Sequence, residues 1–123
     1  MFQLKFQYRI TLLILYFLFV SILFFLPGSA FPKENWLSKI WFDKWVHIGI
    51  FAILSAGACW VFNLKQKKKF IVLLLLLIGY GLLVEIIQGK FVPNRDYDLG
   101  DLLADTIGSI GGIFFWFQRY IKK

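Results

Sequence analysis

Long apolar runs dominate this chain and decide what it can fold into. A helix that crosses the ~30 Å apolar core of a bilayer needs about 20 apolar residues, with a range of about 17–25. Four segments of the chain meet that length, namely residues 10–26, 45–63, 70–88 and 99–117. We therefore predict an all-α membrane protein whose four transmembrane helices form a single domain over residues 1–123.

The composition excludes the ordinary soluble class, since 59% of the residues are apolar and the mean hydropathy is +0.71. The net charge of +7 does not indicate a nucleic-acid partner. The basic residues are divided among membrane-edge clusters rather than gathered on one face of a soluble module. The single cysteine, Cys59, lies within an apolar segment, and we expect it to serve packing.

The positions of lysine and arginine indicate the orientation, because cytoplasmic loops near the membrane are enriched in them. Basic residues without an acidic neighbour precede the first helix, join the second to the third, and follow the fourth: Lys5, Arg9, Lys65, Lys67, Lys68, Lys69, Arg119, Lys122 and Lys123. The seven acidic residues belong to the other side. We predict a multi-pass protein of the inner (cytoplasmic) membrane with both termini in the cytoplasm.

The first apolar run also has features of a signal peptide, because Lys5 and Arg9 precede it and small residues follow at 28–30. Cleavage there would leave three spans. However, the run of 17 residues exceeds the about 7–15 of a signal's apolar region. We therefore expect the first helix to remain uncleaved.

The segment between the first two helices contains ENWLSKIWF at residues 34–42, which mixes tryptophan and other apolar residues with polar ones. Tryptophan favours the headgroup level of a membrane. We predict a short amphipathic interfacial helix on the outer surface that anchors the chain. A lid over a lipid-facing entrance is the alternative.

Three of the predicted helices carry a polar stripe near the outer end. Asp43 and His47 are four residues apart, and Glu85 and Gln88 are three apart, so each pair shares a helix face. The last helix has the longest stripe, with steps of 3, 4, 3 and 4 residues: Asp98, Asp101, Asp105, Gly108 and Gly112. Because small residues let membrane helices approach closely, the two glycines should turn the aspartates inward.

An aspartate that faces lipid at the bilayer centre costs about 2.5–3.5 kcal/mol, so these acids should face the bundle interior. They would form a wet pocket open to the outer side, a buried ion-pair network, or a set of partly protonated acids. The nearby cations Lys44, His47 and Arg95 are fewer than the acids, which leaves room for a proton or a cationic ligand. We predict a ligand-binding set of Asp43, Lys44, His47, Glu85, Gln88, Arg95, Asp98, Asp101 and Asp105.

Four motifs occur in order along the chain: DKxxH at 43–47, ExxQ at 85–88, PxR at 93–95 and DxxDxxxDxxGxxxG at 98–112. Together they resemble the VanZ-like family of small bacterial membrane proteins, over roughly residues 41–112. The resemblance implies a minimal VanZ-like domain with a link to teicoplanin-type glycopeptide resistance. It marks Asp43, Lys44, His47, Glu85, Gln88, Arg95, Asp101, Gly108 and Gly112 as family positions. The chain departs from the family at Asp105, where asparagine is usual.

Several functions are compatible with these residues. We expect a pocket that binds an outer-leaflet ligand such as a lipoglycopeptide or a cell-wall lipid. The first alternative is an intramembrane enzyme that acts on a lipid or precursor headgroup, with His47, Glu85 and Asp101 as its acid/base groups. The second is a purely structural polar network in an accessory subunit. A transporter would need a polar path to the inner side, of which the sequence gives little sign.

No cofactor or resident metal is expected. His47 and the carboxylates are acceptable ligands for a divalent cation. The sequence DYDLGD at 96–101 is similar to the start of a calcium-binding loop, but Ile107 occupies the position of the bidentate glutamate. Membrane lipids are the predicted partners, nucleic acid is not, and the oligomeric state stays open.

Overall fold

The computed structural model describes residues 4–25, 42–91 and 99–121, and within these ranges the regular structure is entirely helical. The helices are α1 (Phe6–Phe24), α3 (Phe42–Phe62), α4 (Lys67–Phe91) and α5 (Leu99–Trp116), and a π-helical turn, η2 (Phe117–Ile121), continues α5. The all-α prediction is therefore confirmed for the described residues. Most of the predicted interfacial segment, at 34–41, lies outside them.

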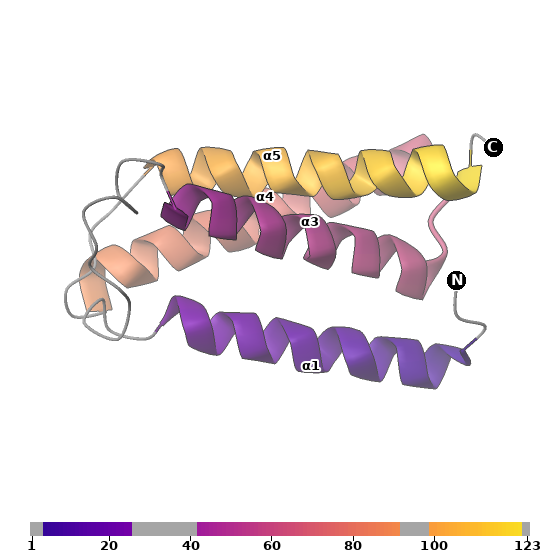
Figure 1. Ribbon diagram of the computed structural model, residues 1–123, viewed down its shortest axis with the longest axis horizontal. Coiled ribbons are helices and arrows are strands. Elements are labelled where there is room, and N and C mark those ends of the chain that lie inside the picture. The colour runs from indigo at the N-terminus through magenta and orange to yellow at the C-terminus, as the bar shows by residue number, and fades with distance from the viewer. Residues whose placement is uncertain (1–3, 26–41, 92–98, 122–123) are drawn as a thin grey trace.

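The four long helices run back and forth along one axis (Figure 1). α1 and α4 run in one direction, while α3 and α5 run in the other. The N-terminal end of α1 and the C-terminal end of α5 therefore lie on the same side of the bundle. The opposite side holds the C-terminal ends of α1 and α4 together with the N-terminal ends of α3 and α5. This arrangement brings residues from three helices to one end of the bundle.

Three helices in the described part are long and apolar enough to cross a membrane: Phe6–Phe24, Lys44–Phe62 and Lys67–Phe91. The chain therefore has the composition and helix lengths of a membrane protein. α5 is 18 residues long and contains Asp101 and Asp105 in its first half, which lower its hydropathy.

The helices extend beyond the apolar runs in the sequence. α1 begins at Phe6 rather than at residue 10, and α4 begins at Lys67 and ends at Phe91 rather than covering 70–88. Lysine and glutamine are good helix formers, so a helix continues where its hydropathy falls. α3 ends at Phe62, and Asn63 follows with φ 49°, a left-handed conformation that asparagine tolerates at a helix C-terminus.

α3 and α5 pack closely along their lengths. A Cβ atom added at Gly108 would overlap the backbone of Ile48, and one at Gly112 would overlap Ser55 Oγ and the carbonyl oxygen of Ala52. These two glycines therefore let the backbones of α5 and α3 approach each other. The prediction of a small-residue contact face on the last helix is confirmed.

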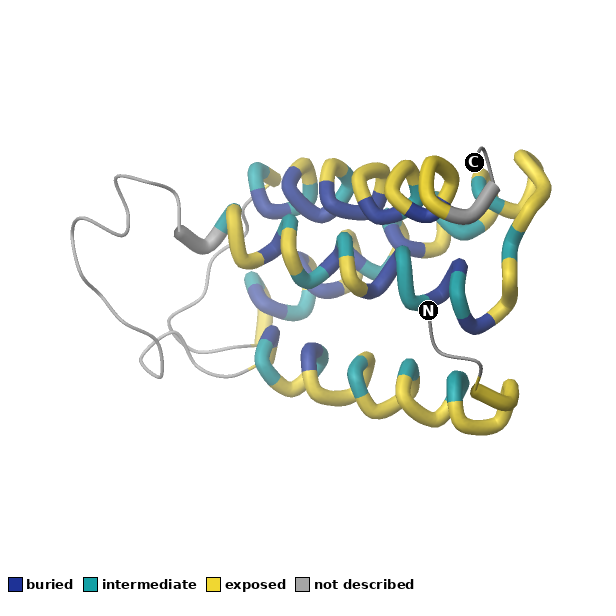
Figure 2. Tube along the Cα trace, turned by 45° about the vertical axis from the view of Figure 1, so that its right-hand side comes forward, coloured by how far each residue is buried: buried dark blue, intermediate teal, exposed yellow. Residues whose placement is uncertain are grey.

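α1 is the most exposed helix of the described bundle, and most of its surface is accessible (Figure 2). Its buried residues Val20 and Phe24 join a core cluster with Phe51 and Leu54 of α3 and with Leu77 and Val84 of α4. Two hydroxyl contacts add to this packing. Tyr16 donates a hydrogen bond to the carbonyl oxygen of Ile50 (2.9 Å), and the hydroxyls of Ser21 and Tyr80 lie 2.6 Å apart.

Candidate functional site

Polar side chains from three helices meet at the end of the bundle where α3 and α5 begin and α4 ends. We call this group the buried polar cluster, and it consists of Lys44, His47, Glu85, Gln88, Asp101 and Asp105. The exposed fraction is 2% for Glu85 and 0% for Asp105. Since an ionisable side chain is almost never this deeply buried unless it is paired, the arrangement of partners decides what the cluster can do.

The shortest contact in the cluster joins α3 to α5. His47 Nδ1 lies 2.6 Å from Asp105 Oδ1, with both side chains buried. The ring of Phe24 from α1 lies against the imidazole, with 5.0 Å between the ring centroids. The carboxylate and the aromatic ring together fix the orientation of the imidazole.

The other imidazole nitrogen faces a second carboxylate. His47 Nε2 lies 3.6 Å from Asp101 Oδ2, which is longer than a hydrogen bond but short enough for an electrostatic interaction. The other oxygen of Asp101 accepts a hydrogen bond from Lys44 Nζ at 2.9 Å. Asp101 therefore lies between the ammonium group of Lys44 and the imidazole of His47.

Asp105 has one oxygen bound to His47 and a second, Oδ2, that is buried without a hydrogen-bond partner among the described residues. This oxygen points toward α4. A Cβ atom added at Gly81 would lie 2.8 Å from Asp105 Oδ2, which is closer than real Cβ contacts come. Gly81 thus provides the space that the second oxygen of Asp105 occupies.

His47, Glu85 and Asp101 each offer a ligand atom, and these atoms lie within 4.8 Å of one another. One imidazole and two carboxylates are acceptable ligands for a divalent cation. In this arrangement the ammonium group of Lys44 already binds Asp101, so a metal ion would compete with it. Among the described residues the cluster contains three carboxylates and two basic groups, Lys44 and His47.

Gln88 joins α4 to α1 within the cluster. Its Nε2 donates a hydrogen bond of 2.7 Å to the carbonyl oxygen of Phe24, the last residue of α1. The side chain is buried, with an exposed fraction of 2%. Gln88 therefore holds the end of α1 against α4, next to the acidic residues.

The structure brings together most of the residues predicted from the sequence. The three predicted acid/base residues, His47, Glu85 and Asp101, lie in one cluster with Lys44 and Asp105. Asp43 lies in α3, but its side chain is outside the described part, as are Arg95 and Asp98. The segments 26–41 and 92–98, which contain most of the predicted interfacial segment and the PxR motif, are also outside it.

The sequence reasoning missed the part that α1 plays in the site. Phe24 contacts His47 and accepts the hydrogen bond from Gln88, and Ser21 contacts Tyr80. The only sequence signal was the presence of Tyr16 and Ser21 within an otherwise apolar run. Hydroxyl groups in a membrane helix usually find a partner on a neighbouring helix.

The oriented imidazole has the geometry of a general base. A carboxylate that binds one ring nitrogen fixes the tautomer and leaves the other nitrogen to exchange protons. The nearby hydroxyls are engaged elsewhere, since Ser109 donates to the carbonyl oxygen of Asp105 at 2.8 Å and Ser55 to that of Ala52 at 3.1 Å. Neither of these two described hydroxyls is therefore placed as a nucleophile, and chemistry among the described residues would use an activated water or a carboxylate.

Comparisons of the chain with protein-family models, with curated proteins and with solved structures gave no match. The resemblance to VanZ-like proteins therefore depends on the order and spacing of the four motifs. It enters below as part of the proposed function.

Proposed function

We propose that this chain is a VanZ-like integral membrane protein whose buried polar cluster binds a cell-envelope ligand on the extracytoplasmic side of the inner membrane. All four long helices cross the membrane, and both termini lie in the cytoplasm. The ligand is a lipoglycopeptide or a cell-wall lipid, and binding contributes to resistance against teicoplanin-type glycopeptides. The motif order supports the family, and the cluster supports the binding function.

Two features support this orientation and the fourth span. The end of the bundle opposite the cluster holds the start of α1, the link between α3 and α4, and the end of α5. These parts carry basic residues, as expected of the cytoplasmic side: Lys5, Arg9, Lys65, Lys67, Lys68, Lys69 and Arg119. The aspartates that lower the hydropathy of α5 are buried among α3 and α4, with exposed fractions of 7% for Asp101 and 0% for Asp105. A membrane helix tolerates such residues when they face the bundle interior.

The observation that carries the proposal is the gathering of three carboxylates in one buried site. Glu85, Asp101 and Asp105 lie together at one end of the bundle, and Asp105 Oδ2 is buried without a hydrogen-bond partner among the described residues. Because a buried polar atom is costly unless it is paired, the cluster favours a ligand that supplies an ammonium group or hydrogen-bond donors. Ionisable residues kept inside a membrane bundle usually serve a ligand, ion or proton.

The ion pair between Lys44 and Asp101 is the point where a ligand can enter. The Lys44 side chain is 25% exposed and that of Asp101 is 10% exposed, whereas Glu85 and Asp105 lie deeper. A cationic group on the ligand would displace the Lys44 ammonium from Asp101 and then reach Glu85. Lys44 would in this way act as an exchangeable counter-ion.

Titration calorimetry of the purified protein in detergent with teicoplanin tests the binding function. We expect saturable binding by the wild-type protein and an affinity at least about tenfold lower in Glu85→Gln, because a hydrogen bond to a charged group contributes about 1.5–3 kcal/mol. The matched control is Lys90→Gln, which removes an exposed charge from the same end of α4. An absence of binding by the wild-type protein, or equal affinity in Glu85→Gln, would contradict the proposal.

The contact between His47 and Asp105 favours a second candidate, an intramembrane enzyme that acts on a lipid or precursor headgroup. In that case, cells that express the protein would show a changed lipid or muropeptide profile by mass spectrometry, and His47→Gln would abolish the change. An unchanged profile would eliminate the enzyme and leave binding. A structural role alone predicts that both variants unfold more easily but alter neither binding nor the profile.

A further inference from the structure

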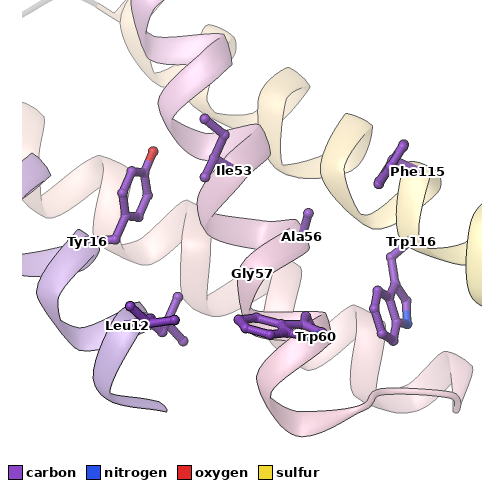
Figure 3. Close-up of a pocket in the computed structure, with 9 residues that line it drawn as sticks. Leu12, Tyr16, Ile53, Ala56, Gly57, Trp60, Phe115 and Trp116 are labelled. Carbon is purple, nitrogen blue, oxygen red and sulfur yellow. The ribbon is translucent and has the colours of Figure 1, made fainter. Parts of the chain in front are cut away.

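A second site lies in the other half of the bundle. A cavity of about 340 Å³ opens between α1, α3 and α5, and its lining is almost entirely apolar (Figure 3). α1 contributes Leu12, Leu13 and Tyr16, α3 contributes Ile53, Ala56, Gly57 and Trp60, and α5 contributes Phe115 and Trp116. No residue of the buried polar cluster lines this cavity.

The volume of the cavity limits what it can hold. Small-molecule sites in proteins have volumes of about 300–1,000 Å³, so this cavity lies at the lower end of the range. This volume and the apolar lining suit one hydrocarbon chain better than a whole lipid. Because the three helices that line it are apolar on their outer faces, the surrounding bilayer is the nearest source of such a chain.

A charged side chain, Arg9, lies next to one of the residues that line the cavity. Arg9 lies three and four residues before Leu12 and Leu13 and thus on the same face of α1. Its Cζ atom lies 6.0 Å from the ring centroid of Trp60, which lines the cavity. The Arg9 Nε atom is buried and has no hydrogen-bond partner among the described residues, although a guanidinium group carries five donors.

We propose that this cavity holds one acyl chain of an anionic phospholipid from the surrounding bilayer, with the phosphate of that lipid bound by Arg9. The apolar lining buries the chain, and the guanidinium supplies the hydrogen-bond donors that match a phosphate. The lysines at the same end of the bundle, Lys65, Lys67, Lys68 and Lys69, add an attraction for negative headgroups.

The lipid site does not depend on the proposed function. It lies away from the buried polar cluster, and its argument holds whichever side of the membrane the basic end faces. A protein that binds no teicoplanin would still show the lipid preference described here.

Native mass spectrometry of the full chain, released from micelles with added lipid, tests the proposal. Phosphatidylglycerol and phosphatidylcholine with identical acyl chains are the two probes. We expect the wild-type protein to retain phosphatidylglycerol about fivefold more than phosphatidylcholine. This ratio corresponds to about 1 kcal/mol, which is the typical attraction of one basic residue for an anionic membrane lipid. In Arg9→Gln the preference should disappear.

The matched control is Lys68→Gln, which removes a positive charge from the same end of the bundle on α4, a helix that does not line the cavity. The control should keep the preference. If Lys68→Gln loses it as fully as Arg9→Gln does, the attraction belongs to the whole basic surface and the site is disproved. Retention of the preference in Arg9→Gln, or its absence in the wild-type protein, also overturns the proposal.

The position of the acyl chain needs a separate variant. Ala56→Phe places a ring in the cavity, and we expect retention of phosphatidylglycerol to fall at least fivefold while the circular dichroism spectrum stays helical. Full retention by a folded Ala56→Phe would show that the chain lies elsewhere. Should this variant not fold, the comparison between the wild-type protein and Arg9→Gln decides. A dimer that forms with loss of the lipid would assign the cavity to a second copy and overturn the proposal.

Discussion

His47 Nδ1 lies 2.6 Å from Asp105 Oδ1, and this contact joins α3 to α5 at a depth where neither side chain reaches solvent. A short contact that is shielded from water is electrostatically strong, and its loss leaves a polar group without a partner. The same contact orients the imidazole toward Asp101. Stability and the candidate chemistry therefore depend on one pair of residues.

Removal of the Asp105 carboxylate should reveal this dependence. We expect Asp105→Ala to lower the free energy of unfolding by about 3–5 kcal/mol, because breaking a buried pair leaves the other member unsatisfied. Asp105→Asn keeps an acceptor for His47 and should lose less than half as much. Unfolding in mixed micelles with increasing sodium dodecyl sulfate, followed by circular dichroism, measures both values. Equal losses in the two variants would show that the hydrogen bond to His47 is not the main contribution.

Gly81 should be intolerant of a side chain because Asp105 Oδ2 occupies the adjacent space. In Gly81→Ala the added methyl group would displace Asp105 and lengthen its contact with His47, with an expected loss of about 1–3 kcal/mol. Gly79→Ala is the matched control on the same helix, since a Cβ there has no neighbour within 4 Å. The thermal unfolding midpoint in detergent should fall for the first variant only. A similar fall in both would point to the helix backbone rather than to the cluster.

The contact between α3 and α5 gives a second pair of glycine variants. Gly112→Ala would overlap Ser55 and Ala52, and the backbone on both sides of the contact leaves little room for adjustment. We expect it to separate the two helices and lower the unfolding midpoint strongly. Gly111→Ala, which meets no atom within 4 Å, should leave the midpoint unchanged or slightly higher because alanine favours the helix. A Gly112→Ala protein as stable as the wild type would contradict the close approach.

The ion pair between Lys44 and Asp101 should contribute an intermediate amount. Lys44 is partly exposed whereas Asp101 is buried, so the coupling should be ~1 kcal/mol, above most surface pairs and below fully buried ones. A double-mutant cycle with Lys44→Met and Asp101→Asn measures this coupling. A parallel cycle with Lys90→Met, which removes an exposed lysine from α4, should give a coupling near zero. Equal values in the two cycles would mean that only the general charge balance matters.

Much of the candidate site follows from spacing within single helices. Asp101, Asp105 and Gly108 lie on one helical face because they are spaced four and three residues apart. A face with small residues packs against another helix, so the burial of both aspartates is predictable. Glu85 is predictable for a similar reason, since a carboxylate near the membrane interior must avoid lipid. These arguments need only the period of the helix and the chemistry of the side chain.

The pairing of residues between helices was not predictable. It depends on the axial register of one helix against its neighbour, which no spacing within a segment encodes. The hydrogen bond between Gln88 and the end of α1 is such a case, and so is the choice of His47 rather than Lys44 as the partner of Asp105. The cavity near Arg9 was not predictable either, because its lining residues come from three different helices.

The sparse packing of α1 has a consequence for the order in which the protein assembles. α1 leaves the ribosome first, yet the residues that it packs against, such as Phe51 and Tyr80, are synthesised later. Its 19 apolar-rich residues can stay in the bilayer as an independent helix during that interval. α3 and α4 must then both be in the bilayer before α1 has its full binding surface, so α1 docks later than it is made.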